Sequence, residues 1–225
     1  MSTVILQARS SSKRFKNKVL AQINGKPMIY YVYKRILKSE KVKKIIIACS
    51  NHRSDDQLFW YCKSKGFLVE RGSLNNLVQR FNKVIKKYKL KYFIRISGDS
   101  PCMDFNVINK VYKVFRKNNC DIATNVYPRS FPKGISVEVI KTKIFKKLLT
   151  KKLSLYNKEH VTSYFYENAK DYRIYNLKNS INRSRKSLAL DTKNDFKKLK
   201  PIIKQKDFFN LNWQNILNKK NRLWK

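Results

Sequence analysis

The stretch that decides the fold is Thr3-Val-Ile-Leu-Gln-Ala-Arg9-Ser-Ser-Ser-Lys-Arg14-Phe-Lys-Asn-Lys18-Val-Leu20. Residues 3–8 read as a buried strand, and three serines and four cationic side chains follow over residues 10–18. Backbone N–H groups and hydroxyls in such a loop can bind a polyphosphate, and the Arg and Lys side chains neutralise its charge. The stretch therefore predicts a phosphate-binding loop at the carboxyl end of a strand.

Downstream of this loop, short apolar runs alternate with amphipathic segments. Strands are expected at 43–49, 67–70, 92–96 and 121–124, and helices at 27–38, 55–65, 77–88 and 107–115. Pro27 suits the first position of its helix, Ser54 can cap the next helix, and Gly66 can end it. The alternation predicts a mainly parallel sheet with helices on both faces, which is a Rossmann-like three-layer α/β sandwich.

Polar side chains stand where several of these strands end. Besides the serine-rich loop, Ser50-Asn51, Arg71-Gly72 and Gly98-Asp99 all follow expected strands. In open α/β sheets ligands bind beyond the carboxyl ends of the strands. Acidic residues at that edge can hold the Mg²⁺ that bridges a bound phosphate. The sequence therefore predicts one ligand site at this edge of the sheet.

The regular alternation breaks after Asn125. Residues 127–134 hold two prolines and a glycine and read as an irregular loop. Further strands are expected at 137–140, 172–177 and 187–190, and helices at 159–168, 193–205 and 212–220. Because no long linker, internal repeat or low-complexity block interrupts the chain, we expect a single domain over residues 1–225.

The composition is that of a globular chain. It is 42% hydrophobic and 13% aromatic and contains no apolar stretch of 18 residues, so no membrane span is expected. The N-terminus lacks the charged-then-apolar layout of a signal peptide. The four cysteines are widely spaced and form no C-x-x-C pair, which argues against a zinc site or a disulfide framework. We therefore expect reduced thiols and a cytoplasmic location.

The formal net charge of +38 has two explanations. So large a positive net charge suggests nucleic acid as a binding partner. The alternative is compositional drift, because Lys, Asn, Ile and Tyr are all abundant, as an AT-rich coding sequence would produce. The lysines are spread over every expected helix, and no helix-turn-helix, zinc-finger or RNA-recognition signature accompanies them. We expect salt-sensitive nonspecific binding, and no specific nucleic acid.

Further motifs follow the loop in an order that resembles one family. They are Gly25-Lys-Pro-Met28, Arg71-Gly72, Arg95-Ile-Ser-Gly-Asp99-Ser-Pro101, Val137-Glu138, Glu159-His-Val-Thr162 and Leu190-Asp191-Thr-Lys-Asn-Asp195. Together with Ile5-Leu-Gln-Ala-Arg9, they make the chain resemble the cytidylyltransferases that produce CMP-activated sugars, above all the spore-coat polysaccharide type. The resemblance extends, more distantly, to acylneuraminate and 3-deoxy-manno-octulosonate cytidylyltransferases, and it covers roughly residues 3 to 200.

This resemblance implies the nucleotide-diphospho-sugar transferase fold. It also implies a reaction of CTP with a sugar, expected to be an acidic sugar for surface polysaccharide, to give CMP-sugar and pyrophosphate with Mg²⁺. The nucleotide-binding residues that it implies are Ala8, Arg9, Ser12, Arg14, Lys18, Arg71 and Gly98. The catalytic residues that it implies are Arg9, Lys18, Asp99 and His160. Asp99 and Asp191 match the metal ligands, and Glu138 and His160 are the sugar-side candidates. Relatives in this group often pair, so a homodimer is among the expected states.

The phosphate and metal residues also have plainer explanations. Arg9 and Lys18 belong to 52 basic side chains, most of which face solvent in any fold. Asp99 can cap the turn that follows it, and Asp191 can be the N-cap of the helix from about residue 193. The chemistry nevertheless agrees with the implied roles, because attack at the α-phosphorus needs positioning and charge neutralisation more than a protein nucleophile.

The roles of the sugar-side residues are less clearly defined by the sequence. No general base is obvious, and His160 can be a sugar contact and proton acceptor or a structural residue of its helix. Glu138 can contact the sugar or pair with one of the many lysines. Arg71 falls where relatives contact the cytosine, which is a weaker assignment.

Several positions depart from the family pattern. Relatives usually carry glycine where Ser11 stands and Pro-Gly where Lys16-Asn17 stand, although Asn tolerates left-handed backbone geometry. Ser136 stands where aspartate is common, and the apolar residues from Leu188 to Leu190 replace a more polar stretch. The last two changes lie on the expected sugar side, so the identity of the sugar stays open.

Two other function classes compete with this interpretation. A nucleotide-sugar-dependent glycosyltransferase would share the fold class, but such enzymes commonly hold their metal with an Asp-x-Asp motif, and none occurs here. A basic nucleic-acid-binding protein is suggested by charge alone.

Overall fold

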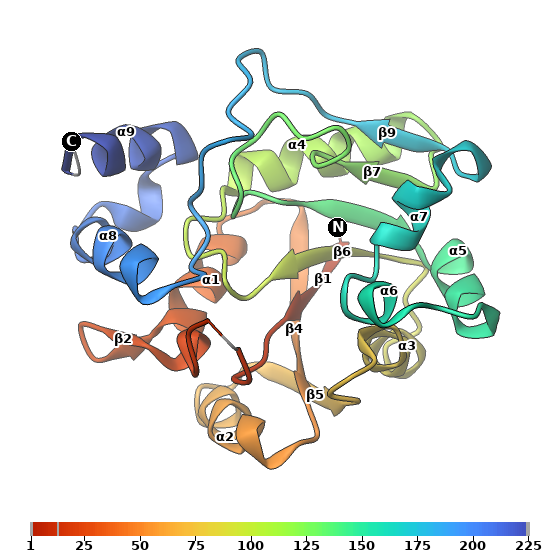
Figure 1. Cartoon of the computed structure of the whole chain (residues 1–225), viewed down its shortest axis with the longest axis horizontal. Coiled ribbons are helices and arrows are strands. Elements are labelled where there is room, and N and C mark those ends of the chain that lie inside the picture. The colour runs from red at the N-terminus through yellow and green to blue at the C-terminus, as the bar shows by residue number, and fades with distance from the viewer. Residues whose placement is uncertain (1, 13, 224–225) are drawn as a thin grey trace.

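The computed structural model describes residues 2–12 and 14–223. Over these residues a seven-stranded sheet has the order β5-β4-β1-β6-β8-β7-β9 (Figure 1). Its strands are β1 (Ser2–Gln7), β4 (Val42–Ser50), β5 (Leu68–Gly72), β6 (Tyr92–Ser97), β7 (Ile122–Thr124), β8 (Glu138–Lys141) and β9 (Ile174–Asn176). Neighbouring strands run parallel except at β8, which is antiparallel to both β6 and β7. The predicted mainly parallel sheet is confirmed.

Helices connect the strands and cover the sheet. They are α1 (Met28–Leu37), α2 (Asp56–Ser64), α3 (Leu77–Lys87), α4 (Phe105–Lys117), α5 (Thr142–Lys146), α6 (Leu155–Glu159), α7 (Ser163–Glu167), α8 (Lys193–Ile203) and α9 (Trp213–Leu223). A small antiparallel hairpin of β2 (Gln22–Ile23) and β3 (Lys26–Pro27) precedes α1. Pro27, expected as the first helical residue, is instead the N-cap of α1 with an extended backbone.

The alternation of side chains along β1 explains the three layers. Val4 and Leu6 pack into one hydrophobic core with residues of α1, α2, α4, α8 and α9. Ile5, which points to the other face, packs into a second core with residues of α3, α5 and α7. Figure 1 shows α1, α8 and α9 to one side of the sheet and α3, α5, α6 and α7 to the other. A strand that buries both faces needs the near-continuous apolar run seen in residues 3–6.

Three further local predictions were wrong. The helix expected at 159–168 is two short helices, α6 and α7, separated at residues 160–162. The segment 187–190 is not a strand, because it meets the chain at a single bridge, Lys133 to Ser187, before Leu188 and Leu190 turn into the core. Ser54 does not cap α2, because its N–H donates to His52 Nδ1 in the preceding turn.

The four cysteines lie buried as free thiols in the described structure. Burial raises the pKa of Cys49, Cys62 and Cys102 to about 12 in each case, so these thiols stay protonated and unreactive at neutral pH. Neither a disulfide nor a metal-binding cysteine site joins them in residues 2–12 and 14–223.

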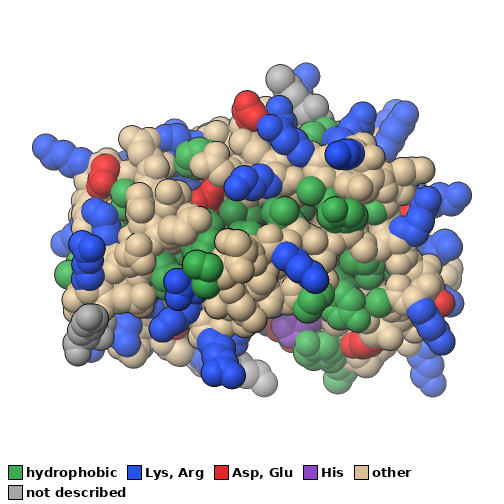
Figure 2. All heavy atoms as spheres, turned by 90° about the horizontal axis from the view of Figure 1, so that it is seen from above, with side chains coloured by type: hydrophobic (Ala, Val, Ile, Leu, Met, Phe, Trp, Pro, Cys, Tyr) green, Lys and Arg blue, Asp and Glu red, His purple; other side chains and the backbone are tan. Residues whose placement is uncertain are grey.

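Basic side chains are dispersed over the surface. Figure 2 shows Lys and Arg scattered across the face that it presents, with no single concentrated patch. Across the part of the chain that the structure describes, no helix combines the length and apolar character needed to cross a membrane.

Candidate functional site

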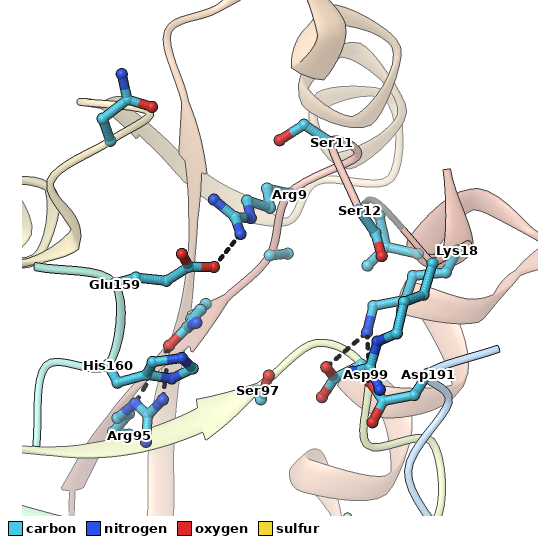
Figure 3. A pocket seen from close by; sticks show the side chains of 15 residues that line it. Arg9, Ser11, Ser12, Lys18, Arg95, Ser97, Asp99, Glu159, His160 and Asp191 are labelled. Carbon is cyan, nitrogen blue, oxygen red and sulfur yellow. Dashed lines mark hydrogen bonds and ion pairs between the residues drawn. The ribbon is translucent and has the colours of Figure 1, made fainter. Parts of the chain in front are cut away.

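A cavity of about 570 Å³ opens beyond the carboxyl ends of β1 and β6, as the strand order predicts (Figure 3). Eight of the residues predicted for the site line it, namely Ala8, Arg9, Ser12, Arg14, Lys18, Asp99, His160 and Asp191. The other lining residues are Gln7, Ser11, Val19, Asn75, Arg95, Ser97 and Glu159. Segments far apart in the sequence therefore meet where the ligand site was expected.

One group of charges, here called the Lys18 cluster, consists of Arg14, Lys18, Asp99 and Asp191. Lys18 Nζ donates to Asp99 Oδ2 at 2.8 Å and to Asp191 Oδ1 at 3.1 Å, and Arg14 Nη2 lies 3.0 Å from the same Asp191 oxygen. Lys18 is only 9% exposed, so its ammonium is aimed into the cavity rather than into solvent. The plainer explanation of Lys18 as a surface charge is wrong.

The backbone brings the two aspartates together. Gly98 N–H donates to Gln7 O at 2.7 Å, and a Cβ at Gly98 would lie 3.0 Å from that oxygen, so glycine lets β6 end against β1. Leu190 N–H then donates to Asp99 O at 2.8 Å, which sets Asp191 beside Asp99.

Neither aspartate is used for helix capping. The N-cap of α8 is Thr192, which forms a capping box with Asp195, and the N-cap of α4 is Asp104. The carboxylates of Asp99 and Asp191 therefore face the cavity, with side chains 26% and 28% exposed.

This pair of carboxylates fits a divalent cation that is held partly by its ligand. No group of three or more His, Cys, Asp or Glu side chains capable of holding a metal occurs in residues 2–12 and 14–223. Mg²⁺ is usually bound by one or two carboxylates together with substrate phosphates, and it keeps several waters. Asp99 and Asp191 supply that donor set, and the cations around them would neutralise the phosphates.

The loop between β1 and Lys18 is organised around one peptide unit. Ser10 O accepts the N–H groups of Ser12 and Asn17, both at 2.9 Å. Asn17 has φ 57° and ψ 24°, so the position requires the left-handed geometry that relatives obtain from glycine and that Asn tolerates. Ser11 is not among the described residues with positive φ, so serine there causes no strain of this kind.

A second polar group, here called the Arg95 cluster, consists of Arg95, Glu138, Gln7 and Tyr166 and lies across the cavity from the Lys18 cluster. Arg95 Nη1 pairs with Glu138, and its Nε and Nη2 donate to Gln7 Oε1 at 3.2 and 3.1 Å. Glu138 is 1% exposed and also accepts the Tyr166 hydroxyl. Burial alone would lower the pKa of Arg95, but the Glu138 carboxylate raises it, so Arg95 is firmly cationic.

Two further residues of the cavity come from the α6–α7 segment. Glu159, at the end of α6, pairs with Arg9 across the cavity, and His160 lies next to Arg95 in Figure 3. Burial lowers the pKa of His160 below its ordinary value of 6.5, Arg95 and Arg9 lower it further, and Glu159 opposes them. His160 is therefore a neutral imidazole at neutral pH, as a proton acceptor must be.

Three predicted residues lie off the cavity. Gly98 packs against Ala8 and acts through the backbone. Arg71 donates to Ser50 O and His52 O, each at 3.0 Å, and pairs with Asp56 at 2.6 Å, so the structure does not bring it to the cavity. Glu138 lies behind Arg95, and its partner is that arginine rather than a lysine.

The departures on the expected sugar side also lie off the cavity. Ser136 accepts from both Nη atoms of Arg129 at 3.1 Å, a place where an aspartate would form an ion pair. Leu188 is fully buried in the core, where a Cβ at Gly134 would meet its carbonyl carbon at 2.6 Å.

Sequence reasoning assigned no role to several lining residues. Arg95, Ser97 and Glu159 stood inside quoted motifs, and their strand-end and motif positions were the available signal. Gln7 likewise stood inside the quoted motif Ile5-Leu-Gln-Ala-Arg9, whereas Asn75 carried no such signal, because a polar residue within a loop has many explanations.

Comparison with known sequences gives a consistent family. The family model described as cytidylyltransferase matches residues 3–217. The uncharacterized protein MJ1063 of Methanocaldococcus jannaschii is 32% identical over 216 residues, 95% of this chain and 88% of its own. The spore coat polysaccharide biosynthesis protein SpsF of Bacillus subtilis is 28% identical, over 89% of this chain and 85% of its own. A 3-deoxy-manno-octulosonate cytidylyltransferase of Geotalea daltonii is 32% identical over 110 residues, 48% of this chain and 42% of its own.

Solved structures share the fold. A cytidylyltransferase from Leptospira borgpetersenii superposes with a TM-score of 0.91 at 24% identity, covering 99% of this chain and 96% of its own. A CMP:2-keto-3-deoxy-manno-octonic acid synthetase complexed with CTP gives a TM-score of 0.67 at 16% identity, covering 90% and 98%. Rv0371C of Mycobacterium tuberculosis, solved in complex with manganese, gives 0.61 at 12% identity, covering 89% and 97%.

The family model spans the serine-rich loop, both aspartates and the α6–α7 segment of the cavity. The expected nucleotide-diphospho-sugar transferase type of α/β fold is confirmed by these neighbours. The chain belongs to the cytidylyltransferase family and is a CTP-dependent nucleotidyltransferase.

Proposed function

We propose that the chain, acting as one nucleotidyltransferase domain over residues 1–225, transfers CMP from CTP to an acidic sugar and releases pyrophosphate. The observation that carries this proposal is the Lys18 cluster, in which one nearly buried ammonium contacts two carboxylates that follow different strands or loops. Cations and carboxylates that converge on one point suit a metal-bound polyphosphate. The named relatives supply the sugar class, since one is a 3-deoxy-manno-octulosonate cytidylyltransferase and another serves a spore-coat polysaccharide.

The phosphate side of the site consists of the loop and its cations. Ser12, Arg14 and Lys18 line the cavity beside the two aspartates, and Arg9 stands at the start of the same loop. Arg9 and Lys18 neutralise the charge that builds up on the departing pyrophosphate, and Ser12 donates a hydroxyl hydrogen bond. Arg71 remains a candidate for the cytosine end.

Asp99 and Asp191 would hold Mg²⁺. A cation held there would supply Lewis-acid polarisation of the phosphoryl oxygens. Lys18 contacts both carboxylates, so its ammonium lies where it can neutralise a phosphate bound next to them.

The sugar side consists of the Arg95 cluster and His160. Arg95 offers the cavity a fixed positive charge that suits the carboxylate of an acidic sugar, because Glu138 and Gln7 hold its guanidinium in one orientation. His160, neutral at neutral pH, accepts the proton of the attacking sugar hydroxyl. Glu138 acts here through Arg95 rather than on the sugar itself.

The deciding experiment is calorimetric binding of CTP, UTP, ATP and GTP, with and without Mg²⁺, at about 0.3 M salt to suppress nonspecific attraction. We expect selective CTP binding that Mg²⁺ strengthens and that Asp99→Asn abolishes. The matched control is Asp207→Asn, because Asp207 is an exposed carboxylate that follows α8 and lies outside the cavity. Equal weak binding of all four nucleotides that fades with salt would contradict the proposal.

A second experiment addresses the acceptor. Pyrophosphate release is followed with CTP, Mg²⁺ and a panel of acidic sugars, including 3-deoxy-manno-octulosonate and nonulosonic acids, with neutral sugars as controls. Release that depends on an acidic sugar supports the proposal. Transfer of sugar from a preformed nucleotide sugar would favour the glycosyltransferase alternative instead.

We further propose a cytoplasmic homodimer, because CTP is available in the cytoplasm and related enzymes often pair. Analytical ultracentrifugation gives the oligomeric state, and fractionation of the source cells gives the location.

A further inference from the structure

A fully buried carboxylate joins the phosphate-binding loop to the neighbouring strand. Asp55 is 0% exposed, and its two oxygens accept two different backbone N–H groups. Oδ1 accepts from Ser10 N–H at 2.7 Å, and Oδ2 accepts from Ser50 N–H at 2.7 Å. Ser10 follows β1 and Ser50 ends β4, so one side chain ties together the ends of two adjacent strands.

The backbone of Ser10 binds the rest of the loop. While its N–H is held by Asp55, its carbonyl oxygen accepts from Ser12 and Asn17, each at 2.9 Å. Asn17 precedes the short 3-10 helix Lys18–Leu20 that presents Lys18 to the two aspartates of the cavity. Asp55 is therefore linked through Ser10 to the backbone that carries Lys18.

Besides these two hydrogen bonds, the charge of Asp55 opposes the lowering of the pKa of the buried Arg80. Asp55 occupies the N-cap position of α2 but makes no capping hydrogen bond there, although aspartate is among the best capping residues. A buried charge is costly unless it is hydrogen-bonded, and both oxygens of this carboxylate are used on the loop and on β4.

We propose that Asp55 is a positioning residue that holds the phosphate-binding loop in the geometry required by the triphosphate of the substrate nucleotide. It does not touch the ligand, because it does not line the cavity. It acts through Ser10, whose backbone sets the loop. This inference rests on the proposed function to the extent that the bound polyphosphate is that of CTP.

The test compares CTP with CMP in the variant Asp55→Asn. An amide keeps the shape of the side chain but can accept only one of the two N–H groups and turns a donor toward the other. We expect affinity for CTP to fall about tenfold or more, and affinity for CMP to change by less than about threefold, because the loop holds the β- and γ-phosphates.

The matched control is Asp104→Asn. Asp104 is 1% exposed and joins two segments in the same way, accepting from Asn106, Val107 and Trp213 N–H groups at 2.8, 3.2 and 2.8 Å, but it lies outside the cavity. Both variants lose stability, and only Asp55→Asn changes the ratio of CTP to CMP affinity. An unchanged ratio in Asp55→Asn, or the same change in both variants, overturns the proposal.

Inorganic tripolyphosphate separates this inference from the proposed function. If the wild-type protein binds tripolyphosphate but does not prefer CTP, the proposed function fails, and weaker tripolyphosphate binding by Asp55→Asn still supports the inference. If the wild-type protein binds CTP and the variant binds it equally well, the inference fails alone.

A measurement on the wild-type protein covers the case in which Asp55→Asn does not fold. Amide hydrogen exchange should find Ser10 and Ser50 as protected as amides within β1 and β4, because both N–H groups donate to a buried carboxylate. Fast exchange at Ser10 overturns the proposal.

Discussion

Lys18 and Asp99, which stand 81 positions apart in the sequence, meet with Nζ 2.8 Å from Oδ2. The ammonium also contacts Asp191, so one side chain joins the phosphate-binding loop to two acidic positions. Only 14 acidic residues balance 52 basic ones in this chain, yet three acidic side chains line the cavity, and each pairs with a cation. The charges of the cavity form defined ion pairs, whereas the basic side chains on the face in Figure 2 are scattered.

Lys18→Ala should lower kcat/KM for pyrophosphate release by about 10²- to 10³-fold, the range seen when one preorganised electrostatic donor is removed. The variant also leaves Asp99 and Asp191 facing each other without their shared cation. Lys16→Ala, an exposed lysine of the same loop, is the control and should keep wild-type rates. Equal rates in the two variants would show that Lys18 is not part of the catalytic site.

Glu159→Gln should strengthen CTP binding by about two- to fivefold, the range of a partly exposed ion pair. Arg9 pairs with Glu159, and their side chains are 35% and 51% exposed, so a bound triphosphate must compete with this carboxylate for the guanidinium. Calorimetry at fixed Mg²⁺ gives the affinity, and Glu40→Gln, which pairs only with Lys41 among the contacts described, serves as control. Weaker binding by Glu159→Gln would instead mean that Glu159 contacts the ligand.

Glu138→Gln should lower the free energy of unfolding by about 3–5 kcal/mol, because it leaves the Arg95 guanidinium largely buried without its anionic partner. Urea denaturation measures the change. Glu167→Gln on α7 is an exposed control that should shift stability by no more than about 0.5 kcal/mol. The KM for the sugar should rise in Glu138→Gln while the affinity for CTP stays the same. A stable variant with normal sugar KM would show that Arg95 needs no counter-charge.

The pH dependence should report His160. Burial lowers its pKa below the ordinary value of 6.5, so the imidazole is neutral above that pH and becomes cationic only at more acidic pH. A proton acceptor must be neutral, so kcat/KM should fall as the pH drops below 6.5. In His160→Gln this acid limb should disappear together with most of the activity. An acid limb that persists in the variant would assign it to another group.

Much of the fold could be predicted from local patterns. The apolar run of residues 3–8 identified β1, and the 3- and 4-residue spacing from Leu77 to Tyr88 identified α3, because burial on one or both faces leaves a period in the sequence. The segment 187–190 has the same apolar character but is not a strand, since its neighbours offer only one bridge. Apolar composition predicts that a segment is buried, but whether it forms a strand depends on whether another strand lies next to it.

The candidate site was predictable where a motif fixed the residue and its strand end together. Asp99 is such a residue, since it follows β6, whereas Lys18 and Asp191 were identified by their motifs alone, and the structure brings all three into contact. Arg71 lies near the end of β5, but its guanidinium binds Asp56 and backbone carbonyls, and this pairing depends on how the preceding helix α2 begins. Asp55 could not be found from the sequence, because a carboxylate before a helix normally indicates a cap.

The sequence by itself determined the class of fold and the family, because periodic burial and ordered motifs are local properties of the chain. Only the tertiary structure decided which charges pair. Glu138 faces Arg95, Glu159 faces Arg9, and Asp55 supports Ser10 instead of α2. Pairing energies fall off steeply with distance and depend on burial, so they are set by the packing of strands and helices and not by separation along the sequence.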